Sequence, residues 1–132
     1  SIEINLRSPT KEWWNKLIEM IPDYKIIQLG HPDSELLSDK IINCRNLSLF
    51  DAAKISLGCD LSITTDSGIG WILGAYGANQ ICVYTNYAEN HHSNLDCYLP
   101  INHKNNLISL FGKGGINNIN QEEILESINK FK

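Results

Sequence analysis

Short apolar runs alternate with segments of helical periodicity along most of the 132 residues. The strand-like runs lie at 2–6, 24–30, 42–44, 61–65, 80–85 and around "LISLF". The helical segments lie at 8–21, 47–59, 68–77 and 120–131. This alternation is typical of a parallel sheet covered by helices. We therefore expect one domain, residues 1–132, with an α/β fold: a Rossmann-like three-layer sandwich whose mainly parallel sheet has about five or six strands.

Residues that favour helix ends stand at the borders of the helical segments. Ser8 or Thr10, Ser48 and Asn120 offer side-chain oxygens as N-caps, and Gly77 is placed to end the helix at 68–77. These residues support the predicted boundaries.

Two segments have weaker patterns. "HPDSELLSDKI" follows Gly30 and predicts a loop that opens a short helix, with Asp33 or Ser34 as its cap. Residues 86–118 contain Pro, Gly and Asn clusters, and we expect mostly loop there apart from the one short strand.

Composition and charge narrow the possible partners. The net charge is −4 and the chain has no Lys/Arg cluster, so nucleic acid is not expected as a partner. No run approaches the roughly 18 apolar residues of a membrane span, and "SIEINLRS" lacks the layout of a signal peptide. We expect a cytoplasmic, soluble protein. The four cysteines show no C-x-x-C spacing, which favours reduced structural thiols.

The most distinctive polar segment is "TTDSGIG", residues 64–70, between a predicted strand and a predicted helix. In open α/β sheets, ligands bind at such carboxyl ends of strands. Gly68 and Gly70 permit close approach of the backbone, Ser67 offers a hydroxyl, and the helix offers free N–H groups to a phosphate or diphosphate. The alternative is that Asp66 or Ser67 only caps the helix. The segment is neither a P-loop nor a dinucleotide fingerprint.

Two other loops carry polar groups at the same predicted edge. Arg7 and Lys11 follow the first strand, and their charges suit a diphosphate. His31, Asp33 and Glu35 follow the second, and a carboxylate there suits ribose hydroxyls. The alternatives are ordinary solvated charges and simple helix capping.

Metal binding and nucleophilic catalysis have little support in the sequence. A set of possible ligands has no recognisable zinc spacing. Its members are His91, His92, Asp96, Cys97 and His103. Cys59 and Cys82 lie in apolar runs, and there is no G-x-S-x-G elbow. We expect no metal site and no catalytic triad.

Four motifs together resemble the C-terminal, donor-binding half of heptosyltransferase-like glycosyltransferases, family 9. The motifs are "KEW" at the first helix, a strand ending at Gly30 before an acidic loop, "SL" opening a later helix, and "DSG". All four occur in the family's order, and the resemblance extends over nearly the whole chain. It implies one half of a GT-B fold, which binds a nucleotide-diphosphate sugar without a bound metal.

The resemblance also suggests roles for individual residues. Lys11 is similar to the family's phosphate-contacting lysine, and Arg7 stands where a polar residue often lies near the donor. Glu35, or less closely Asp33, corresponds to an acidic residue that contacts the nucleoside. Asp66, Ser67 and Gly68 are similar to the loop that meets the diphosphate and sugar. With Gly30 and Gly70, these complete the predicted donor site.

Two features depart from the family pattern. Trp71 stands where family members commonly have His, and an indole cannot accept a proton. The N-terminal half, which in the family binds the acceptor and holds the proposed catalytic base, has no counterpart in these 132 residues.

Because the general base is lacking, we assign no catalytic residue and expect this chain alone to be inactive. The interpretation is therefore a donor-binding domain that works with an acceptor-binding domain in the same or another chain. The alternatives are a non-catalytic Rossmann-like module that binds a nucleotide or a protein, or a domain similar to nucleotide-sugar 2-epimerases.

Overall fold

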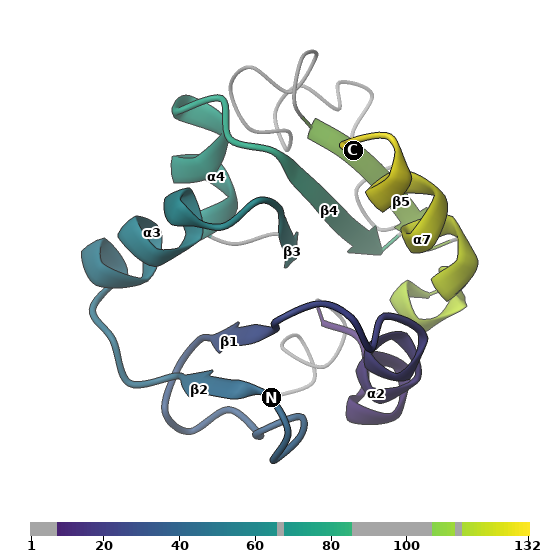
Figure 1. Cartoon of the computed structure of the whole chain (residues 1–132), viewed down its shortest axis with the longest axis horizontal. Coiled ribbons are helices and arrows are strands. Elements are labelled where there is room, and N and C mark those ends of the chain that lie inside the picture. Colours follow the sequence, from purple (N-terminus) through teal and green to yellow (C-terminus); the bar gives the residue numbers. More distant parts are fainter. Residues whose placement is uncertain (1–7, 66–67, 86–106, 113–114) are drawn as a thin grey trace.

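The computed structural model describes residues 8–65, 68–85, 107–112 and 115–132 (Figure 1). The chain alternates between helices and strands, as the periodicity predicted. In order, the elements are α2 (Lys11–Met20), β1 (Ile27–Leu29), β2 (Ile42–Cys44), α3 (Leu49–Gly58), β3 (Ser62–Thr65), α4 (Gly68–Ala75), β4 (Gln80–Thr85), β5 (Leu107–Gly112), the 3-10 helix η2 (Ile116–Asn118) and α7 (Gln121–Asn129). The predicted strand at 2–6 lies outside the described residues.

All strand pairs in the described part of the chain are parallel, which confirms the α/β class. β1 pairs with β2, and β4 lies between β3 and β5 in a second sheet. The five strands thus form two sheets here, whereas the sequence predicted one. β1 is also shorter than the predicted strand at 24–30, because only Ile27–Leu29 has a partner, in β2.

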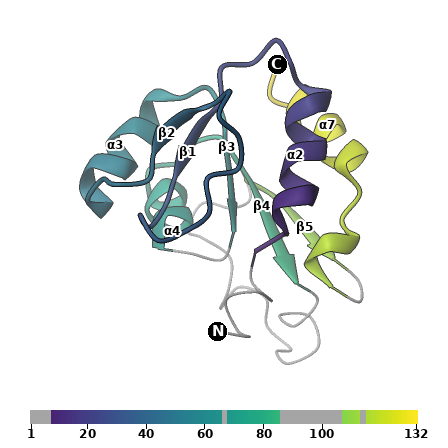
Figure 2. The ribbon, with the colours of Figure 1, turned by 90° about the horizontal axis from the view of Figure 1, so that it is seen from below.

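The main core lies between β4 and the helices α2, η2 and α7, which cover one face of the sheet (Figures 1 and 2). Side chains alternate between the faces of β4. Ile81 and Val83 point into this core, where they meet Trp13 and Leu17 of α2. Gln80 points to the other face, where its side chain contacts α4. Burial on both faces explains why β4 reads as a continuous apolar run.

Helix α2 is attached to elements more than 100 residues later in the chain. The indole Nε1 of Trp13 donates to the carbonyl of Ile119 at 2.8 Å, and the backbone N–H of Thr10 donates to Oδ1 of Asn117, also at 2.8 Å. Gln121 donates from Nε2 to the carbonyl of Trp13 at 3.2 Å. These bonds hold the first turn of α2, and therefore the backbone of Lys11, in one place.

The predicted N-caps of α2, α3 and α7 are confirmed. Thr10, Ser48 and Asn120 accept from backbone N–H groups in the first turns of α2, α3 and α7. Of the two caps offered for the first helix, the structure therefore uses Thr10. Each side chain satisfies an N–H that has no partner within its helix.

The short helix predicted after Gly30 is wrong. Residues 31–41 form turns and bends without a helix or strand. Several backbone groups that a helix would pair internally are instead bonded to side chains from outside the segment. Gln28 bonds to the backbone of Glu35 and Leu37, and Arg45 donates to the carbonyl of Ser34.

Candidate functional site

Lys11 is the first residue of α2 and carries the cation of the candidate site. Its neighbour Thr10 caps the helix and is bonded through its backbone to Asn117. The side chain of Lys11 is 39% exposed, so it extends toward solvent from a backbone that is held in place. Figure 2 shows this end of α2 and the carboxyl end of β4 on the same side of the molecule.

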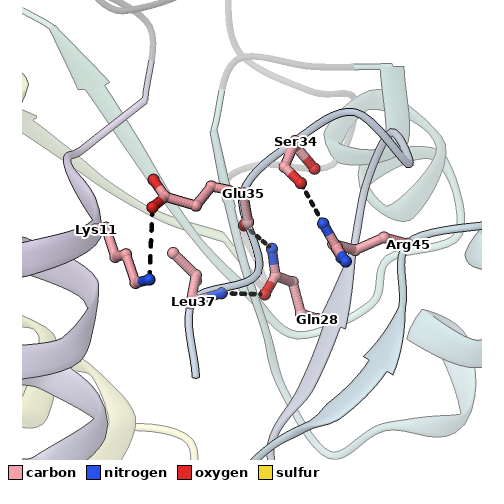
Figure 3. Close-up of polar contacts among 6 residues, drawn as sticks. All are labelled: Lys11, Gln28, Ser34, Glu35, Leu37 and Arg45. Carbon is pink, nitrogen blue, oxygen red and sulfur yellow. Dashed lines mark hydrogen bonds and ion pairs between the residues drawn. The ribbon is translucent and has the colours of Figure 1, made fainter. Parts of the chain in front are cut away.

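The structure brings Lys11 next to Glu35, the acidic residue predicted for the nucleoside contact. Nζ of Lys11 lies 3.4 Å from Oε1 of Glu35 (Figure 3). The two residues come from α2 and from the loop after β1, so their meeting depends on the fold. The Glu35 side chain is 67% exposed, and ion pairs this open contribute at most about 1 kcal/mol. Both groups can therefore exchange this contact for a ligand at little cost.

The loop that carries Glu35 begins at Gly30, whose φ of +143° suits glycine and few other residues. His31 and Asp33 interact with each other. The Nδ1 of His31 accepts from the backbone N–H of Asp33 at 3.1 Å and lies 3.5 Å from its carboxylate. Both side chains are largely exposed, so of the acidic residues in this loop Glu35 is the one with a cationic partner on α2.

Two residues absent from the predicted site hold this loop in place. The side-chain amide of Gln28 bonds to the backbone of Glu35 and Leu37 through its nitrogen and its oxygen, and the guanidinium of Arg45 donates to the carbonyl of Ser34 (Figure 3). No signal in the sequence identifies them. Gln28 stands within an ordinary strand pattern, and its bonds depend on the path of a loop that was predicted as a helix.

The other predicted site residues lie at the start of α4 or outside the described residues. A Cβ built on Gly68, the first residue of the helix, would meet no heavy atom of another described residue within 4 Å, apart from the adjoining backbone of α4. Gly70 is buried, and its Cβ would lie 3.4 Å from the carbonyl oxygen of Thr65. Gly70 therefore brings α4 close to the sheet. Arg7, Asp66 and Ser67 lie outside the described residues.

Trp71 stands in the first turns of α4 and is 36% exposed. In the parts of the chain that the structure describes, no three His, Cys, Asp or Glu side chains gather as a metal-binding group. The set around His91 lies outside those parts. Within the described ranges, no helix has the length and apolarity to cross a membrane.

Comparison with known proteins supports the fold but identifies no family. No protein-family model matches the sequence, and no curated protein matches it. The structure is similar to that of ADP-heptose LPS heptosyltransferase II from E. coli, with a TM-score of 0.73 and 16% sequence identity. The match covers 96% of this chain and 42% of that one. The chain thus has a heptosyltransferase-like fold, the Rossmann-like half of a GT-B arrangement, and spans less than half of the length of the E. coli protein.

Proposed function

We propose that the chain is the donor-binding domain of a glycosyltransferase. It binds a nucleotide-diphosphate sugar and supports transfer of the sugar to an acceptor held by a second domain, in the same or another chain. The protein would work in the cytoplasm, where nucleotide sugars are available as substrates.

One observation carries this proposal. Lys11, the predicted diphosphate contact, and Glu35, the predicted nucleoside contact, lie 24 residues apart in the sequence. Their charged groups lie 3.4 Å apart. A nucleoside diphosphate has the matching arrangement, because its anionic diphosphate is directly joined to a ribose with hydroxyl donors. The heptosyltransferase-like fold supports the same assignment.

The domain would act by positioning the donor and stabilising charge. Negative charge develops on the nucleoside diphosphate as the bond to the sugar breaks, and fixed cationic or N–H groups lower the free energy of that state. Lys11 supplies one charge, and we assign a second to Arg7. We also assign the N–H groups at the start of α4, together with Asp66 and Ser67, to the phosphates. This arrangement needs no resident metal.

Glycosyl transfer also needs a general base to remove the proton from the acceptor hydroxyl. We assign that base to the acceptor-binding domain, and this chain alone would not catalyse transfer. Trp71 changes the sugar contact, because its ring offers stacking area and one N–H donor but no basic nitrogen. The competing function is a nucleotide-binding module without a catalytic partner.

Calorimetric titration tests the donor-binding proposal. We expect one of the ADP-, UDP- or GDP-sugars to release heat and to raise the melting temperature, and EDTA to leave its affinity unchanged. A ligand at 100 times its Kd stabilises the folded state by about 2.7 kcal/mol. If none of these sugars releases heat or shifts the melting temperature, the proposal is wrong.

Variants of the loop at 66–70 locate the diphosphate. Gly68→Val should abolish nucleotide affinity and preserve the fold, because its Cβ meets no atom of the described residues beyond its own helix within 4 Å and the side chain would occupy space assigned to the ligand. Asp66→Ala should also abolish affinity. Circular dichroism checks the fold. Folded variants that bind as tightly as the unaltered chain would put the phosphates elsewhere.

A further inference from the structure

The side chain of Gln28 behaves as a short piece of β-ladder. Its Nε2 donates to the carbonyl of Glu35, and its Oε1 accepts from the backbone N–H of Leu37, both at 2.9 Å (Figure 3). A neighbouring strand would offer the same donor and acceptor pair to an extended segment. The amide of one residue in β1 therefore fixes the backbone on both sides of Leu36.

Arg45 holds the same segment one residue earlier. Its guanidinium donates to the carbonyl of Ser34, and its Nε donates to Oδ1 of Asn43 at 3.0 Å. Asn43 also accepts from the backbone N–H of Arg45 at 3.1 Å. Asn43 thus orients the guanidinium, whose planar group keeps a defined direction toward Ser34.

Gln28 and Arg45 act as two clamps, because the backbone groups that they bind lie on both sides of the Glu35 side chain. Arg45 donates to the carbonyl of Ser34, the residue before Glu35. Gln28 bonds to the carbonyl of Glu35 and to the N–H of Leu37, two residues later. Glu35 is in no helix or strand, so these side chains supply order that a regular element would otherwise provide. The only charged contact found for the Glu35 side chain among the described residues is Lys11, and with the backbone held its carboxylate stays within reach of that ammonium.

We propose that Gln28 and Arg45 are positioning residues for nucleoside recognition. They hold the backbone of Glu35 so that its carboxylate accepts from the ribose hydroxyls of a nucleoside diphosphate whose phosphates lie at Lys11. This inference rests on the proposed function and deepens it. The clamps act on the nucleoside side of the ligand, so they affect a nucleoside diphosphate and not the diphosphate group alone.

The test compares two kinds of probe. Affinities for ADP, UDP, GDP and inorganic pyrophosphate are measured calorimetrically for the unaltered chain, Gln28→Ala, Glu35→Ala and the double variant. We expect Gln28→Ala to lower the affinity for whichever nucleoside diphosphate binds by about fivefold to tenfold, because Gln28 acts through a single contact residue. The same substitution should leave the affinity for pyrophosphate unchanged. In the Glu35→Ala background, Gln28→Ala should cause no further loss.

One variant serves as a matched control, and two further variants test the bonds made by Arg45 and Gln28. Asn79→Ala removes another exposed side-chain amide that bonds to a backbone carbonyl, that of Asp60, away from the 30–37 loop, and should leave every affinity unchanged. Arg45→Lys keeps the charge but loses the planar guanidinium group. It should therefore lower the affinity for the nucleoside diphosphate and leave the affinity for pyrophosphate unchanged. Gln28→Glu keeps the acceptor for Leu37 but sets a carboxylate oxygen against the carbonyl of Glu35, so it should weaken the affinity for the nucleoside diphosphate at least as much as Gln28→Ala does. It replaces Gln28→Ala if that variant does not fold.

Hydrogen exchange of the Leu37 amide checks the clamp without ligand. This amide should exchange slowly in the unaltered chain and at least about tenfold faster in Gln28→Ala. If the unaltered chain binds no nucleotide, the proposed function fails and this inference falls with it. If the unaltered chain binds and Gln28→Ala binds equally well, or weakens pyrophosphate as much as the nucleotide, only this inference is overturned.

Discussion

At the residue scale, the glycines of the predicted site do different things. Gly30 has a positive φ at the end of β1, where it starts the loop that carries Glu35. A Cβ on Gly68 would meet no described residue beyond its own helix within 4 Å, and Gly70 lets α4 approach the sheet. The three glycines therefore have three different roles: one forms a turn, one leaves room for a ligand, and one allows close packing.

Gly30→Ala should destabilise the chain. A Cβ at φ +143° is strained and would lie 3.4 Å from Oγ of Ser34, so we expect a loss of about 1–3 kcal/mol in the free energy of unfolding. Gly58→Ala is the matched control, because Gly58 is the last residue of α3 and a Cβ there meets no described residue beyond its own helix and chain neighbours within 4 Å. It should stabilise by about 0.5–1 kcal/mol. Urea denaturation of both variants measures the difference, and equal effects would contradict it.

At the element scale, α4 is fastened at both ends. At its start, the fully buried Gln80 donates from Nε2 to the carbonyl of Gly70 at 3.1 Å and accepts from Oγ1 of Thr64 at 2.7 Å. At its end, the N–H groups of Gly77 and Ala78 donate to carbonyls of the last turn, as in a Schellman motif, with Gly77 at φ +67°. The first turn, which faces the proposed diphosphate, is therefore held by a buried polar pair.

The effects of substituting the two partners on the free energy of unfolding should not be additive. Thr64→Val leaves the buried Oε1 of Gln80 without its donor, and Gln80→Leu leaves the hydroxyl of Thr64 without its acceptor. Each should lower the free energy of unfolding by about 1–3 kcal/mol. The double variant should lose less than the sum, by about 0.5–3 kcal/mol. Urea denaturation of all four proteins gives the coupling, and additive losses would show that the pair does not act as a unit.

At the scale of the whole molecule, the fold joins α2 to the C-terminal elements. Trp13 is 5% exposed in the main core and reaches the carbonyl of Ile119 through its indole nitrogen. Lys11 lies two residues earlier in the same helix. The ammonium of the proposed site is thus positioned by residues near 117–121, which have no part in the site itself.

Trp13→Phe should weaken the attachment of α2. The ring keeps most of its apolar contacts but loses the donor to Ile119, so we expect a loss of about 1–3 kcal/mol in the free energy of unfolding. Trp71→Phe makes the same chemical change at a partly exposed position and should alter stability by less than about 0.5 kcal/mol. Thermal denaturation of the two variants compares them. A Trp13→Phe variant as stable as Trp71→Phe would refute the role of this bond.

The sequence by itself determined the elements that depend on near neighbours. The α/β alternation, the strands at β2, β3 and β4, and the N-caps Thr10, Ser48 and Asn120 follow from periodicity and from bonds that reach three residues or fewer. These features are local, so a single sequence carries their signal.

Only the tertiary structure decided how the loops run and which side chains meet. The segment 31–41 has helix-like residues but no helix, since Gln28 and Arg45 compete successfully for its backbone groups. The contact between Lys11 and Glu35 and the bond from Trp13 to Ile119 likewise join residues that are distant along the chain. Their geometry depends on the packing of several elements at once, and no short segment of sequence records it.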